Sequence, residues 1–244
     1  MEHGFLWLNF ITGPLTEFFN NLFNTADPAT SSFFRDSNMY NQVVYMWLYM
    51  LFLTVIGFLA TRAIKMVPGA LQNFMEVVVD GLRGLLMDNM GPHGMIFFPL
   101  IATIAVFIFT ANMAGIIPGF FSPTANMNTN AAMALVVFVL THIVGVRIHG
   151  IKYLKQFMGP VWWMAPIMIP IELIGHLARP LSLTMRLFGN IAGEDLVLGV
   201  LLLLVPYVVP LPFLALMIFT SVLQAFVFSL LAMMYISGAM EEAH

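Results

Sequence analysis

Formal charge is missing from two long stretches of the chain, residues 89–146 and 196–240, when histidine is counted as neutral. Each stretch exceeds the roughly 20 apolar residues that cross a bilayer as one helix. Of the 244 residues, 9% are charged and 60% are hydrophobic, whereas a water-soluble domain carries about 25% charged residues. Such a chain cannot cover a folded surface in water, so the sequence predicts an integral membrane protein.

Several site chemistries are excluded by what the sequence lacks. With no cysteine, the chain has no disulfide, thiol nucleophile, iron–sulfur cluster or cysteine-ligated zinc. It contains no Gly-rich phosphate loop and no GxSxG or HExxH motif, which argues against a membrane hydrolase. The formal net charge is only −3, and no basic patch suits a nucleic-acid backbone. We therefore expect no cofactor, no metal and no nucleic-acid partner.

Charge placement predicts the orientation of the first segments. Residues 1–42 form an acidic lead-in without the positive start of a signal peptide, so we expect a mature N-terminus. The first predicted span, 43–61, is followed at once by Arg62 and Lys65. Short loops rich in Lys and Arg stay in the cytoplasm. The lead-in is therefore predicted to lie outside the cytoplasm and the C-terminus inside.

The rest of a single membrane domain, 43–244, is predicted to hold four more spans. In order, the elements are a charged, amphipathic surface helix (68–90), a hairpin of two spans (95–118 and 131–147) and two long helices (161–205 and 207–240). The long helices exceed a perpendicular crossing, so they must tilt or bend, and prolines 166, 170 and 180 offer bends. The predicted fold class is all-α, with about five transmembrane helices and one surface helix.

The segment 172–195, ELIGHLARPLSLTMRLFGNIAGED, places ionisable groups inside a predicted span. At 100° per residue, several polar side chains fall within about 40° of Asn190 on one helix face. They are Glu172, His176, Arg179, Arg186 and Glu194, with Ser182 at the edge and Asp195 pointing away.

Ionisable groups at membrane depth cost several kcal/mol and commonly mark ion pathways. The default interpretation of this polar stripe is therefore an ion pathway. Structural ion pairs or helix caps near a headgroup are the alternative for Glu172 and Arg179. Arg186 has apolar neighbours on both sides, and its guanidinium stays charged in any protein setting, so the structural alternative suits it least.

The last long helix carries a milder polar face. Thr220 and Ser221 are interpreted as structural, because hydroxyls in membrane helices commonly bond their own backbone or a neighbouring helix. Gln224 is a candidate polar partner for another helix. Asn112, Asn126, Asn128 and His142 are interpreted as loop caps or interhelical hydrogen-bonding residues rather than ligands.

At RPLSLTMRLFGNIAGED, residues 179–195, the sequence resembles the a subunits of F-type ATP synthases. The segments PGALQNFMEVVVDGLRGLL, ANMAGIIP, SPTANMN and LQAFVFSLLAMMYISGAMEEAH look like further segments of that family, over residues 40–244. The resemblance implies a stator subunit whose two long tilted helices wrap a ring of proteolipid c subunits. It also implies two proton half-channels, peripheral-stalk b subunits and the rest of the F1Fo complex as partners, and phosphate chemistry elsewhere in that complex.

The resemblance also implies roles for individual residues. Arg186 matches the essential arginine that faces the c-ring carboxylate, with Asn190 beside it and Gln224 as its partner on the last helix. The proton path on the cytoplasmic side matches Glu172 and Ser182, which share the polar stripe with His176.

On the external side, Glu194 and Asp195 are both candidates for the one carboxylate of the proton path. In the family, the external carboxylate follows an Ala-Gly pair, and here that position is Glu194. Counting the same number of residues from the arginine without a gap gives Asp195 instead. Helix phase favours Glu194 unless the helix is unwound there. Some members carry a histidine where this chain has Met217, and an acidic residue where it has Asn126 or Gly115.

Two other function classes remain open from the residues alone. A secondary transporter with Arg186 binding an anionic substrate is the main alternative, although such transporters are commonly built from internal repeats, and the chain shows no matching halves. A structural membrane subunit with buried ion pairs is the other. A short chain without a transit peptide is expected in a bacterial inner membrane.

Overall fold

The computed structural model describes residues 37–62, 64–66, 68–117, 120–150, 153, 165–204 and 208–240. Every regular element in this part of the chain is helical. The long helices are α3 (Ser37–Thr61), α4 (Ala70–Met90), α5 (Phe98–Gly115), α6 (Met127–His149), α8 (Ala165–Leu204) and α9 (Pro210–Met240). Two 3₁₀ helices, η1 (Pro92–Phe97) and η2 (Pro123–Ala125), precede α5 and α6. The predicted all-α class is confirmed.

Five described segments are long and apolar enough to cross a membrane. They are Val43–Thr61, Pro92–Gly115, Met127–His149, Met168–Leu204 and Pro210–Met240. Helix α4 is the exception because its outer face carries charge, with Glu76, Asp80, Arg83 and Asp88 all exposed. The lead-in residues 1–36 and the loop residues Lys152 and Lys155 lie outside the described residues, and the orientation of the termini stays a prediction.

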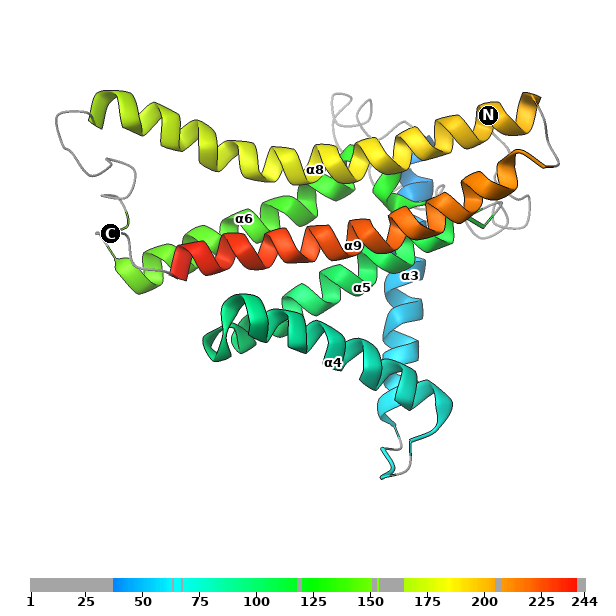
Figure 1. The fold of residues 1–244 in the computed structure, drawn as a ribbon, viewed down its shortest axis with the longest axis horizontal. Helices are drawn as coiled ribbons and strands as arrows, with labels where there is room; N and C mark the ends of the chain where they lie inside the picture. The colour runs from blue at the N-terminus through cyan, green and yellow to red at the C-terminus, as the bar shows by residue number, and fades with distance from the viewer. Residues whose placement is uncertain are drawn as a thin grey trace, which may run out of the picture.

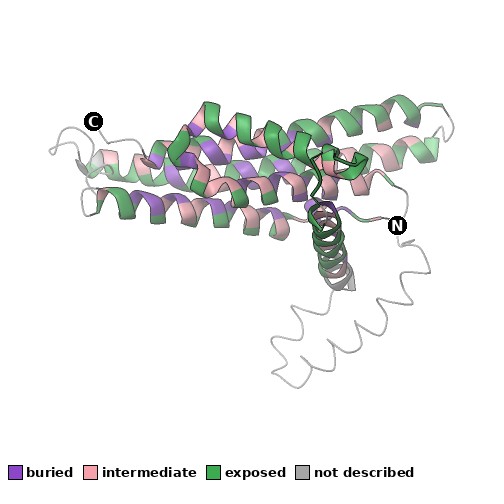
Figure 2. Cartoon of the chain, turned by 90° about the horizontal axis from the view of Figure 1, so that it is seen from below, coloured by how far each residue is buried: buried purple, intermediate pink, exposed green. Residues whose placement is uncertain are grey.

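The helices pack in a layered arrangement around α9 (Figure 1). Helices α8 and α9 run side by side along the longest axis, α6 packs on both, and α5 packs along α9. Helix α3 runs across this group, and Figure 2 shows it almost end-on while α8 and α9 are seen lengthwise. The main core brings together apolar residues of four helices: Ile104, Ile108, Ala134, Val137, Leu183, Leu187, Ile191, Ala225, Phe228 and Ala232.

Helix α8 has 40 residues and is uninterrupted. At ~1.5 Å per residue it is about 60 Å long, twice the ~30 Å hydrocarbon core of a bilayer. A helix of this length stays within the membrane only if it is strongly tilted. Pro170 and Pro180 lie inside it, and each removes one backbone hydrogen bond without ending the helix. The helix is correspondingly bowed (Figure 1).

Local capping explains where two helices begin and end. Helix α6 begins at Met127, four residues before the predicted span, because the Asn126 side chain accepts a hydrogen bond from the Asn128 backbone at 2.8 Å. Helix α4 ends at Gly91, whose φ of 63° lies in the left-handed region that favours glycine. Its inner face buries Leu86 and Met90 against α5 and α9, so the charged outer face is left free.

Candidate functional site

Arg186 lies on an exposed side of α8. The rotation of the helix is set by Leu183, Leu187 and Ile191, which are 2%, 0% and 4% exposed and pack in the main core. Because adjacent side chains on a helix are about 100° apart, burying Leu187 turns Arg186 away from that core. Its guanidinium contacts only the Ser182 hydroxyl, at 3.5 Å. Among the described residues no carboxylate forms an ion pair with it.

Asn190 links α8 to α9 one turn further along. Its Nδ2 donates a hydrogen bond to Oε1 of Gln224 at 2.8 Å. Gln224 is 4% exposed, and its own Nε2 has no hydrogen-bond partner among the described residues. Met217 is buried on the same helix. It occupies the position where some members of the family that the sequence resembles carry a histidine. The sequence led us to expect Gln224 as a partner of Arg186, whereas the structure shows it bonded to Asn190; its role stays a prediction.

The two neighbouring carboxylates, Glu194 and Asp195, lie in different surroundings. Helix α8 is continuous through both, so the helix-phase argument applies without an unwound turn. Glu194 is half-buried and its carboxyl interacts with the Thr220 hydroxyl of α9. Its Oε2 is buried without a hydrogen-bond partner in the described segments. Asp195 is exposed. Glu194 therefore lies beside the last helix, whereas Asp195 is exposed.

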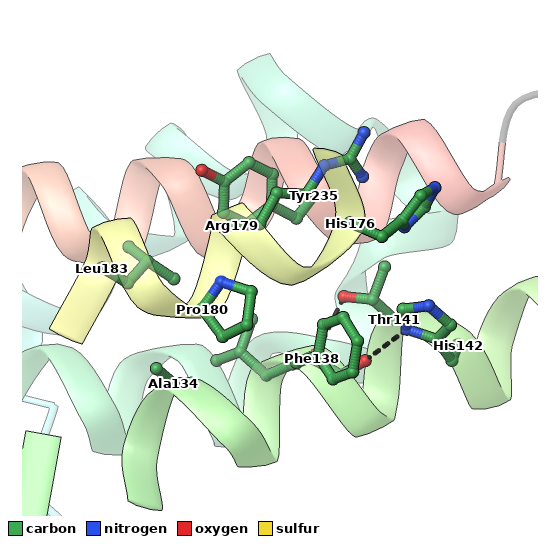
Figure 3. Close-up of a pocket in the computed structure, with 10 residues that line it drawn as sticks. Ala134, Phe138, Thr141, His142, His176, Arg179, Pro180, Leu183 and Tyr235 are labelled. Carbon is green, nitrogen blue, oxygen red and sulfur yellow. Dashed lines mark hydrogen bonds between the residues drawn. The ribbon is translucent and has the colours of Figure 1, made fainter. Parts of the chain in front are cut away.

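The first part of the polar stripe packs within the chain. Nε2 of His176 lies 3.4 Å from Oε1 of Glu172, one turn earlier on α8. The guanidinium carbon of Arg179 lies 5.4 Å from the ring centre of Tyr235 on α9, a cation–π contact. Figure 3 shows Arg179 and Tyr235 on one side of a small pocket, with His176 beside them. The side chains expected to form a single polar stripe therefore have different contacts: Glu172 and His176 contact each other on α8, and Arg179 contacts α9.

His142 of α6 was not among the residues selected from the sequence as part of the site. Its ring centre lies 5.3 Å from that of His176, with the rings at 68°. Its Nδ1 lies 2.9 Å from the Phe138 carbonyl, which can only accept, so Nδ1 carries the proton. Residues 142 and 176 belong to different helices, and no spacing or motif indicates that they meet.

Other polar residues serve the structural roles predicted for them. The Thr220 hydroxyl donates to backbone carbonyls of its own helix. Asn112 accepts from the Thr124 hydroxyl at 2.6 Å and so ties α5 to η2, and Asn126 caps α6. No group of three or more His, Asp or Glu side chains in the described part of the chain is arranged to hold a metal ion.

Comparisons with known proteins agree over most of the chain. Residues 43–237 match the family described as ATP synthase A chain. The chain is 51% identical to ATP synthase subunit a of Trichlorobacter lovleyi over 244 residues, which covers all of both chains. It is 56% identical to ATP synthase subunit a 2 of Syntrophotalea carbinolica over 205 residues, 84% of this chain and 88% of that one. For the Geobacter sulfurreducens subunit a the identity is 54%, over 83% and 88% of the two chains.

Proposed function

The chain belongs to the ATP synthase A chain family, and on that premise we propose that it is the stator that couples proton flow to rotation in F1Fo ATP synthase. In this role it forms two proton half-channels that meet a ring of proteolipid c subunits. It lies in a bacterial inner membrane as a multi-pass protein, its N-terminus outside and its C-terminus in the cytoplasm. The peripheral-stalk b subunits hold it against the turning ring.

The observation that carries this proposal is the exposed Arg186, which has no ion-pair partner among the described residues. A cation at membrane depth costs about 3 kcal/mol on insertion scales and more in simulations. The described residues supply Arg186 with one 3.5 Å hydroxyl contact and no carboxylate. A charge left uncompensated inside a membrane helix is supported by an acid from outside the chain. A c-ring subunit with one ionisable carboxyl in the membrane fits that need.

The chemistry follows from electrostatics at this contact. A guanidinium within about 4 to 6 Å favours the ionised form of the carboxyl that faces it, so each arriving ring site releases its proton. A protonated, neutral site can then move through lipid, whereas an ionised site carries a large desolvation cost. The permanent charge of Arg186 also repels protons and prevents direct leakage between the half-channels. Proton flow is thereby tied to ring rotation.

The remaining polar residues of α8 are assigned to two paths on either side of Arg186. Glu172, His176 and Ser182 lead to the cytoplasmic side, and Glu194, with Asp195 beside it, leads to the external side. The Asn190–Gln224 bond holds α8 and α9 together between the paths. One charge crossing a potential of 100 mV yields roughly 2.3 kcal/mol, so rotation must sum several protons for each ATP made.

The test is ATP-driven proton pumping by the assembled complex in inverted membrane vesicles. Arg186→Ala is expected to abolish pumping while the variant subunit still assembles, because the partner carboxyl loses its counter-charge. Arg147→Ala makes the same chemical change at the exposed end of α6 and is expected to pump normally. Normal pumping by Arg186→Ala would refute the proposed function.

A further inference from the structure

A second histidine, His142 of α6, joins a partly buried polar cluster beside the N-terminal half of α8. His176 is 4% exposed, and its ring meets the ring of His142 from α6 at 5.3 Å. On its other side Glu172 lies 3.4 Å away and is partly open to the surface, with 37% of its side chain exposed. The cluster therefore leads from the surface of α8, through His176, to a side chain on another helix.

The hydrogen bond of His142 determines which of its atoms can exchange a proton. Its Nδ1–H is held by the Phe138 carbonyl at 2.9 Å, and Figure 3 shows the other ring nitrogen on the side toward His176. Phe138 and Tyr153 pack against the ring, with ring centres 4.2 Å and 6.0 Å away. The ring is thus fixed in place, with Nε2 as the atom available for proton exchange.

A small cavity adjoins both histidines. It is about 10 Å³ in volume and its walls include Thr141, His142, His176, Arg179 and Tyr235 (Figure 3). A single buried water needs roughly 10–15 Å³ and two to four polar partners. The cavity is at the lower limit for one water molecule between α6 and α8, and the two imidazoles line it among mostly apolar side chains.

The charged and titratable groups around the pair are few. Arg179 and Glu172 face it from α8, Tyr235 lines the cavity from α9, and Tyr153 packs on His142. Burial raises the pKa of the Tyr153 phenol, so this group stays protonated near neutral pH. Arg179 already carries a positive charge, so it opposes protonation of both histidines at once.

We infer that His142 is a proton-carrying residue of the half-channel beside the N-terminal half of α8, a role that rests on the function proposed above. Protonated His176 gives its proton to the water in the cavity, and that water gives a proton to Nε2 of His142. The reverse step returns the proton to His176, which passes it to the Glu172 carboxylate and so to the surface. Each transfer moves one proton and consumes nothing else.

The test compares variants of the whole complex by the initial rate of ATP-driven pumping, normalised to assembled complex. His142→Gln keeps a polar side chain but cannot carry a proton, and it is expected to slow pumping about a hundredfold. His93→Gln is the matched control, because it makes the same change at an exposed histidine of η1 that does not line the cavity. This control is expected to pump at the parental rate.

Chemical rescue separates proton transfer from packing. His142→Ala leaves a space in which added imidazole is expected to restore pumping, whereas pyrazole, of the same size but a far weaker base, is not. Equal effects of imidazole and pyrazole, or a His142→Gln rate within about twofold of the parent, would overturn the role of His142. Loss of pumping in Arg186→Ala together with either result would leave the proposed function intact while this inference fails.

Discussion

The two halves of α8 treat their ionisable groups in opposite ways. In the N-terminal half, Glu172 pairs with His176 and Arg179 stacks on Tyr235, so the charges find partners within the chain. At the middle of the helix, the described part of the chain offers Arg186 one hydroxyl at 3.5 Å and no carboxylate. The difference teaches that a charge in a membrane helix is not by itself a mark of function. The informative charge is the one that the fold leaves without a counter-charge.

Identical substitutions in the two halves provide the strongest test of this contrast. We expect Arg186→Ala to lower ATP-driven pumping by more than about a hundredfold, as for loss of a positioned electrostatic contact in an active site. Arg179→Ala loses a cation–π contact worth about 0.5 to 2 kcal/mol and is expected to lower pumping by less than about tenfold. Initial rates of vesicle acidification, normalised to assembled complex, measure both. Equal losses would show that the halves do not differ.

The comparison extends to the two carboxylates at the far end of the stripe. Glu194 faces α9 through Thr220, whereas Asp195 is exposed. We expect Glu194→Gln to slow pumping about a hundredfold, at the lower end for loss of one proton-transfer group, and Asp195→Asn to have a smaller effect. Each substitution removes a titratable oxygen at nearly constant size, so each is a control for the other. The reverse order would contradict the assignment by helix phase.

The smallest expected effect concerns the bond that joins α8 to α9. Asn190→Leu leaves the buried Gln224 amide without its partner, which costs about 1–3 kcal/mol of stability. Gln224→Leu alone is expected to cost less, because Asn190 is exposed. The double variant is expected to be less destabilised than the sum of the two by about 1 kcal/mol. The free energy of unfolding in detergent measures all three, and simple additivity would show that the contact contributes nothing.

Much of the fold could be predicted from the sequence because the signals for helices are local. The charge-free stretches indicated the spans, and the charged face of residues 68–90 distinguished α4 from them. The prediction missed the first turn of α6, since it began the span at Ala131 even though Asn126 was among the predicted caps. Helix phase also separated Glu194 from Asp195, because 100° per residue holds in any uninterrupted helix.

The candidate site was predicted only in part. Arg186, Asn190 and Gln224 were selected from the sequence, and the last two do form a hydrogen bond. We expected one continuous polar stripe on α8, but in the structure His176 contacts α6 and Arg179 contacts α9. His142 was interpreted as a structural residue, and its side chain does bond its own helix. Its position against His176 had no signal in the spacing of either segment.

The sequence by itself determined the membrane class, the helices and the face of α8 on which its polar residues lie, because hydropathy and helical period act over neighbouring residues. Only the tertiary structure decided which of those residues gain partners. That outcome depends on how Leu183, Leu187 and Ile191 pack against side chains from α5, α6 and α9. Packing between helices distant in the chain sets their rotation and register. The same packing that brings His176 to His142 leaves Arg186 exposed.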